Sequence, residues 1–111
     1  MNWIPLQNED QLDEVLSNSN NTPQVIFKHS TRCSISSMAK NKLDKKESPE
    51  GINFYLLDLI RFRGLSNKIA HVFGISHQSP QVLVIDKGKC IFTESHLGIS
   101  FDEIQAATIQ Q

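Results

Sequence analysis

The chain has 111 residues, of which 39% are hydrophobic and 21% are charged, and this length predicts a single domain over residues 1–111. Its 11 Lys and Arg residues are balanced by 12 Asp and Glu residues, which gives a net charge of -1. A nucleic-acid-binding protein of this size would usually carry a basic excess, so the composition argues against that class of partner.

The first part of the chain predicts a helix, a loop and a strand. Apolar residues recur at helical spacing after the N-cap candidate Asn8, which favours a helix at residues 9–17. Residues 17–23 are Ser, Asn, Thr and Pro, which are typical of a loop. The sequence QVIFKH at residues 24–29 has the composition of a short strand in a buried sheet.

The middle of the chain predicts an amphipathic helix and a second strand. The helix covers about residues 34–46, with Ser30 and Thr31 as candidate N-caps. A strand follows at residues 52–58.

The last part predicts a helix, a hairpin and a final helix. The first helix begins at Ser66, and Gly74 stands where a left-handed C-terminal residue is wanted. Strands at residues 82–85 and 90–93 flank the tight turn DKGK. Ser100, with a Glu three residues later, forms a capping box for the last helix.

This order of elements predicts an α/β fold with a central mixed four-stranded sheet flanked by helices. Alternating strands and helices imply parallel crossovers, and the final hairpin adds an antiparallel edge. That is the arrangement of the thioredoxin fold.

The sequence also bears on location and on the state of the cysteines. Residues 1–10 lack a basic segment followed by an apolar run, and no stretch approaches the roughly 18 apolar residues of a membrane span. We therefore expect a cytoplasmic protein with no membrane partner. Two cysteines are too few for a disulfide scaffold, so each is either a reactive or a buried thiol.

Cys33 is the candidate nucleophile. It stands where a strand passes into a helix, so backbone N–H groups without helical partners would stabilise its thiolate, with Arg32 as a nearby cation. Whether Lys28 or His29 reaches the sulfur depends on the direction of the strand's pleat. The alternative is that Cys33 is a small buried apolar residue.

Pro80 supports the reactive interpretation. It stands directly before a predicted strand, and in thioredoxin-like proteins a cis proline at the start of this strand faces the active cysteine. The alternative is an ordinary loop proline.

Several motifs together resemble the YtxJ family, the monothiol bacilliredoxins. They are the run FKHSTRCSIS at residues 27–36, Asp58-Leu59-Ile60 with Arg61 and Arg63, Ser66-Asn67, and His77-Gln78-Ser79-Pro80-Gln81. Where family members carry Thr-Cys-Pro-Ile-Ser, this chain has Arg-Cys-Ser-Ile-Ser. The resemblance implies a thioredoxin fold, a nucleophilic Cys33 and the removal of bacillithiol from mixed disulfides on proteins.

The expected site includes residues beside the cysteine and the proline. Those expected to form the substrate groove and support the thiolate are Thr31, Arg32, Ser34, Ser36, His77, Ser79 and Pro80. Ser36 occupies the place of the second cysteine of a Cys-x-x-Cys pair and cannot resolve a mixed disulfide. Its hydroxyl either donates to the thiolate or lies on the helix surface. Cys90, one strand length from Pro80, is expected too far from Cys33 for a disulfide.

Other polar residues suggest weaker hypotheses. The four histidines lack the spacing of a zinc site, so we expect no metal and no cofactor beyond a low-molecular-weight thiol as co-substrate. Arg61 and Arg63 belong to a solvated loop or bind a substrate carboxylate.

The sequence thus predicts a thiol-disulfide oxidoreductase that acts through one cysteine. Its expected partners are S-thiolated proteins and a small thiol, and the expected state is a monomer or weak dimer. The alternative is a non-catalytic thioredoxin-like module for binding or redox sensing.

Overall fold

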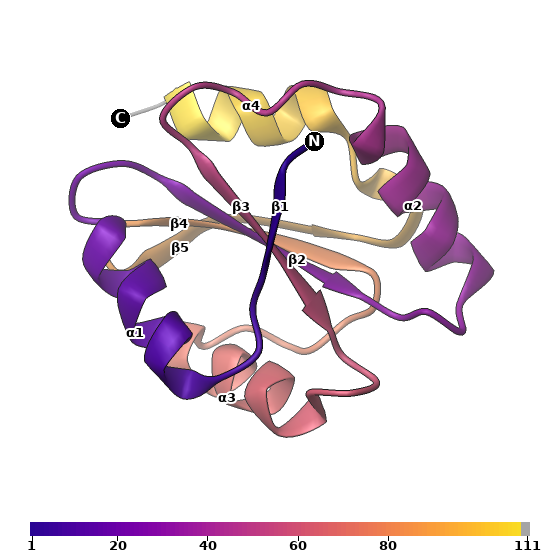
Figure 1. Cartoon of the computed structure of the whole chain (residues 1–111), viewed down its shortest axis with the longest axis horizontal. Coiled ribbons are helices and arrows are strands. Elements are labelled where there is room, and N and C mark those ends of the chain that lie inside the picture. The colour runs from indigo at the N-terminus through magenta and orange to yellow at the C-terminus, as the bar shows by residue number, and fades with distance from the viewer. Residues whose placement is uncertain (110–111) are drawn as a thin grey trace.

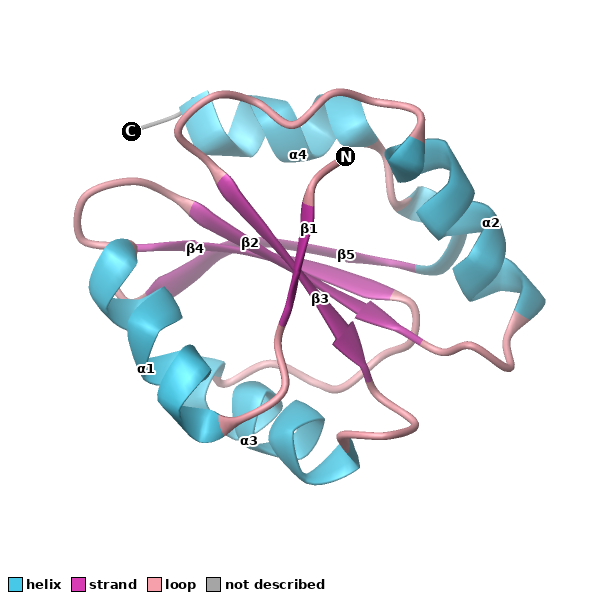
Figure 2. Cartoon of the chain, in the orientation of Figure 1, coloured by secondary structure: helices cyan, strands magenta, loops and turns pink. Residues whose placement is uncertain are grey.

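The computed structural model describes residues 1–109. A five-stranded mixed sheet with strand order β1-β3-β2-β4-β5 lies between two layers of helices (Figures 1 and 2). The elements in chain order are β1 (Trp3–Pro5), α1 (Glu9–Asn18), β2 (Gln24–His29), α2 (Ser34–Asp44), β3 (Asn53–Asp58), α3 (Arg63–Phe73), β4 (Gln81–Asp86), β5 (Lys89–Ser95), the 3-10 turn η1 (His96–Gly98) and α4 (Phe101–Ile109). Within this described part, no helix is both long and apolar enough to cross a membrane.

Strand β2 is central to the sheet and is buried at every position. It runs parallel to β3 and antiparallel to β4, and Lys28 is paired with Gln81. The end of β2 and the start of β4 therefore meet at one edge of the sheet, which is where the chain passes from β2 into α2.

The two faces of the sheet have separate cores, because side chains alternate along each strand. Ile26 of β2 packs with apolar residues of α1 and α3, whereas Phe27 packs with those of α2 and α4. Figure 1 shows the same division, with α1 and α3 on one side of the sheet and α2 and α4 on the other. By this alternation, Lys28 faces the α3 side and His29 faces the α2 side.

Strand β1 was not expected from the sequence, so the prediction of four strands is wrong by one. It pairs in parallel with β3, and the Trp3 indole stacks on Phe27 at 5.6 Å between ring centroids. Trp3 Nε1 also donates to Asp44 Oδ1 at 2.6 Å, at the end of α2. Three residues including a proline are too short for a strand pattern, and tertiary contacts define this strand.

Most predicted boundaries agree with the structure to within a few residues. Helix α3 begins three residues before Ser66, and α2 ends at Asp44 instead of residue 46. Asn8 caps α1 by accepting from Gln11 N at 2.9 Å, and Gly74 has the expected left-handed conformation with φ 64°. Capping signals that act within one turn were therefore predicted correctly.

The N-cap of α2 is a correction. Ser30 and Thr31 were the candidates, but Cys33 itself occupies the N-cap position and no side chain caps this helix. Ser30 does not act as a cap because it is buried at the end of β2, where its N–H donates to Ser36 Oγ.

Candidate active site

Cys33 lies at the junction of β2 and α2 as a partly exposed free thiol. Its backbone is extended, with φ -111° and ψ 121°, and its carbonyl accepts from Ser37 N at 3.0 Å. Because no side chain caps α2, the first N–H groups of this helix are available to a negative charge on the sulfur. This arrangement suits a nucleophilic thiolate.

Ser36 fits neither of its two expected roles. Its side chain is fully buried, so it is not on the helix surface. Its Oγ accepts from Ser30 N at 2.9 Å and lies 2.6 Å from His29 Nδ1. The hydroxyl therefore ties the first turn of α2 to the end of β2, and within residues 1–109 it makes no hydrogen bond with the sulfur of Cys33.

His29, at the end of β2, contacts the first turn of α2 through Ser36. It is buried, stacks on Phe27 at 5.9 Å and holds Ser36 through Nδ1. Burial lowers its pKa below 6.5, and the Lys40 charge lowers it further, while Asp58 and Asp44 oppose the shift. At neutral pH His29 is therefore a neutral, packed group.

Lys28 points to the opposite face of the sheet and is fully buried. Its Nζ donates to Ser66 O at 3.0 Å and lies 3.3 Å from His77 Nδ1. Ser66 Oγ is 3.3 Å from the same Nδ1 atom. Burial lowers the pKa of Lys28 from 10.5 to about 8. This cluster joins β2, α3 and the loop before β4.

Pro80 lies at the same edge of the sheet. The Ser79-Pro80 peptide bond is cis, and Pro80 is buried directly before β4. Its carbonyl accepts from His96 N at 3.0 Å. Since Lys28 pairs with Gln81, Pro80 is level with His29, four residues before Cys33. Among the residues described, the Ser79 hydroxyl is buried without a hydrogen-bond partner.

The other expected groove residues are exposed. Thr31, Arg32 and Ser34 surround Cys33 along the chain, and His77 is exposed in the loop before β4. The structure thus brings the β2–α2 junction and the loop around Pro80 to one edge of the sheet.

Cys90 lies at the opposite end of β4 from Pro80, as expected. It pairs with Ile85, whereas Gln81 pairs with Ser95. At about 3.3 Å per residue, this separation along the strand is too large for a disulfide with Cys33. Cys90 Sγ contacts Phe92 O at 3.3 Å, and burial raises the pKa of this thiol.

Arg61 and Arg63 are exposed around the start of α3. They line a hollow together with Glu9, whose carboxylate forms an ion pair with Lys68. Across residues 1–109, no cluster of three or more His, Cys, Asp or Glu side chains could hold a metal ion.

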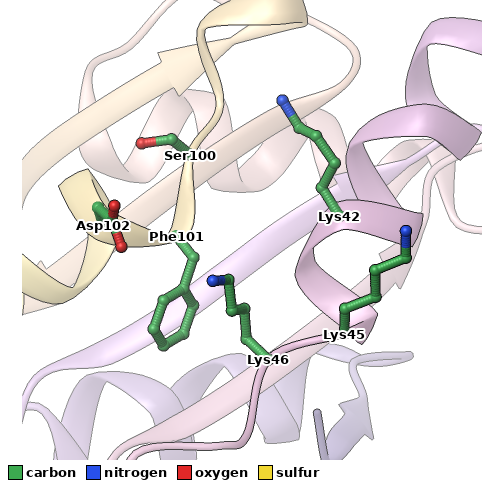
Figure 3. A pocket seen from close by; sticks show the side chains of 6 residues that line it. All are labelled: Lys42, Lys45, Lys46, Ser100, Phe101 and Asp102. Carbon is green, nitrogen blue, oxygen red and sulfur yellow. The ribbon is translucent and has the colours of Figure 1, made fainter.

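A second hollow, of about 390 Å³, lies at the far end of α2 from Cys33. Figure 3 shows Lys42, Lys45 and Lys46 gathered around it with Phe101. Lys42 comes nine positions after Cys33 along the helix, which corresponds to about 14 Å, so this hollow is separate from the thiol.

The sequence left open whether Lys28 reaches the sulfur and gave Ser66 only as part of the family resemblance, so the contact between the two was missed. A lysine within the otherwise buried strand sequence QVIFKH was the available signal, because lysine is almost never fully buried without a partner. Its partner Ser66 lies 38 residues away, and no local pattern connects the two.

Comparisons with known proteins bear on the family and the fold of the chain. The family model described as monothiol bacilliredoxin BrxC matches residues 4–104. A solved protein described as an oxidoreductase with a thioredoxin fold is 28% identical with a TM-score of 0.82, covering 94% of this chain and 91% of that chain.

Two thioredoxins are also similar. That of Malassezia sympodialis is 18% identical with a TM-score of 0.73, covering 98% of this chain and 90% of its own. Mitochondrial thioredoxin 3 of Saccharomyces cerevisiae is 14% identical with a TM-score of 0.75, covering 98% and 95%. At these identities the two thioredoxins support the fold alone, and the predicted thioredoxin fold is confirmed.

Proposed function

Because the chain belongs to the monothiol bacilliredoxin BrxC family, we propose that its Cys33 removes bacillithiol from mixed disulfides on proteins. Family and fold make it a thioredoxin-type oxidoreductase. The proposal adds the substrate, the nucleophile and the one-cysteine mechanism. S-thiolated proteins are the expected partners, and the small thiol is the expected co-substrate in the cytoplasm.

The proposed reaction is two successive thiol-disulfide exchanges. The Cys33 thiolate attacks the sulfur of the bacillithiol cap, and the target cysteine leaves as a thiolate that takes up a proton. Cys33 then carries the cap as a mixed disulfide. An external thiolate attacks the cap sulfur, so that a disulfide forms between cap and external thiol and Cys33 leaves as a thiolate.

The observation that carries this proposal is the isolation of one thiol at a helix N-terminus. Cys33 is partly exposed beside uncapped N–H groups of α2, while Cys90 lies at the other end of β4. Ser36, in the place of a second cysteine, is buried and engaged with His29. A mixed disulfide on Cys33 therefore has no internal thiol to resolve it.

Around Cys33 the exposed side chains of Thr31, Arg32, Ser34 and His77 are the proposed walls of the substrate groove. Ser79 and Pro80 form its floor at the start of β4 in this proposal. The unpartnered Ser79 hydroxyl supports a role in binding, because buried polar groups normally have a hydrogen-bond partner.

The test is transfer of the cap from a protein that carries a bacillithiol mixed disulfide, followed by intact-mass spectrometry. We expect wild type and the matched control Cys90→Ser to gain one cap, and Cys33→Ser to gain none. A Cys33–Cys90 disulfide as the main product would overturn the one-cysteine mechanism. Binding of the thiolated protein without transfer by wild type would instead identify a non-catalytic module.

A further inference from the structure

Lys28 is a buried cation without a counter-ion. Its side chain is fully buried, and within residues 1–109 no carboxylate lies at ion-pair distance from it. A buried ammonium must be hydrogen-bonded to be tolerated. Lys28 meets this need with a backbone carbonyl, Ser66 O at 3.0 Å, and with His77 Nδ1 at 3.3 Å.

This contact determines which nitrogen of His77 carries the proton. An ammonium group has three donors and no acceptor, so the Nδ1 atom beside it must present its lone pair. The single proton of the neutral imidazole is then on Nε2. The Ser66 hydroxyl, 3.3 Å from Nδ1, is compatible with this tautomer because it can also donate.

The other ring nitrogen of His77 has no hydrogen-bond partner within residues 1–109. His77 is an exposed residue, and the contacts of its ring with Lys28 and Ser66 both involve Nδ1, so Nε2 is left for a partner outside the chain. His77 stands three residues before Pro80, in the loop that leads to the proposed groove. An Nε2–H donor in this loop is therefore available to an acceptor on a substrate bound in the proposed groove.

We propose that buried Lys28 is a positioning residue that fixes His77 as the Nε2–H tautomer, and that His77 thereby donates a hydrogen bond to an acceptor oxygen of the thiolated substrate. The second part rests on the proposed function. The first concerns the protein alone.

The charges around His77 favour an anionic acceptor. Burial, Lys28 of β2 and Arg63 of α3 lower the pKa of His77 below 6.5, so the ring is neutral at pH 7. In the described part of the chain, no carboxylate offsets these positive charges at His77. Asp58, at the end of β3, accepts hydrogen bonds from the backbone N–H groups of Ile60 and Arg61. A carboxylate on the small thiol suits this positive surrounding.

The tautomer is tested directly by nitrogen-15 NMR of the histidine rings. In wild type at pH 7 we expect a single Nε2–H form of His77. Above about pH 8 the Lys28 amine loses its proton and can accept, so the Nδ1–H form should appear. Lys28→Met should give a mixture already at pH 7, with the His71 signals unchanged as an internal reference.

The role in the reaction is tested by rescue. Lys28→Met should raise KM for the thiolated protein in proportion to the loss of the Nε2–H form, from about 2-fold for an even mixture of tautomers to at most about 12-fold, the full worth of one hydrogen bond, with kcat retained. In a His77→Gln background, the side-chain NH2 group of the glutamine supplies the hydrogen-bond donor, and Lys28 has no tautomer to select. There Lys28→Met should change KM less than about 2-fold.

Two results overturn the inference: an Nδ1–H form of His77 in wild type at pH 7, or equal effects of Lys28→Met in both backgrounds. The wild-type spectra at pH 7 and pH 9 decide the first point even if Lys28→Met does not fold. Absence of any cap transfer by wild type refutes the proposed function and the donor role with it, while the spectra still decide the tautomer.

Discussion

At the scale of single residues, Ser36 shows how a serine can replace a second cysteine and keep a structural role. Its hydroxyl gives the Ser30 N–H an acceptor and contacts Nδ1 of His29. Both partners are buried, so neither can turn to water if the hydroxyl is removed. This one oxygen therefore links the first turn of α2, directly after Cys33, to the end of β2.

We therefore expect Ser36→Ala to lower the free energy of unfolding by about 1–3 kcal/mol, the cost of a buried group left unpaired. Urea denaturation followed by circular dichroism measures it. Ser37→Ala is the matched control, because Ser37 is less buried and its side chain makes no hydrogen bond to any of residues 1–109. Equal stabilities of the two variants would show that the Ser36 hydrogen bonds contribute nothing.

At the scale of elements, the end of α3 depends on backbone conformation more than on contacts. Gly74 has φ 64°, and its N–H bonds back to the carbonyls of Ala70 and His71. A Cβ at this position would meet no atom within 4 Å. Any loss of stability on adding a side chain at this position therefore comes from the backbone conformation and not from a steric clash.

Gly74→Ala should destabilise the protein by about 1 kcal/mol, because L-residues disfavour the left-handed region. Gly64→Ala, in the first turn of the same helix, has equally open space and no positive φ. It should leave stability unchanged or raise it by up to about 1 kcal/mol. Thermal melting of both variants compares them, and a loss of stability in Gly64→Ala alone would contradict this account.

Sequence reasoning at this scale succeeded where the signal was local. The cap at Asn8, the helix stop at Gly74 and the hairpin turn with φ 50° at Lys87 each depend on neighbours within one turn. It failed for β1 and for the N-cap of α2. Strand β1 depends on the stacking of Trp3 on Phe27, and the N-cap of α2 depends on the burial of Ser30. Both are tertiary features that no local pattern in the sequence shows.

At the scale of the whole molecule, two neutral histidines on opposite faces of the sheet couple folding to pH. Burial lowers the pKa values of His29 and His77 below 6.5. The unfolded chain therefore binds protons more tightly at these sites than the folded protein does. Their contribution to stability is full above about pH 6.5 and is lost as the pH falls through the folded-state pKa values.

We expect the free energy of unfolding to decrease between pH 7 and pH 5, measured by urea denaturation at several pH values. The double variant His29→Asn/His77→Gln should show a shallower decrease over the same range, because neither replacement titrates there. Stability that stays constant or rises toward pH 5 in wild type would mean that these histidines are not held neutral by the fold.

The sequence predicted those site residues that stand at the boundaries of strands and helices. It did not predict contacts between residues far apart in the chain. Cys33, Ser36 and Pro80 were found because each stands beside a strand or helix boundary that the sequence reveals. The contact between Lys28 and His77 spans 49 residues and needs the α3 side of β2 to be known. The direction of the strand's pleat, which the sequence left open, decides that His29 and not Lys28 shares the face of α2.

The stacking of Trp3 on the sheet gives the protein an intrinsic fluorophore. Trp3 is the only tryptophan in the chain, and its ring stacks on Phe27, which in turn stacks on His29. Its emission therefore reports whether β1 is docked over the strand that leads to Cys33. Most extrinsic dyes are attached through thiols, which here would consume the candidate reactive group. Folding can be followed by light with both cysteines left unlabelled.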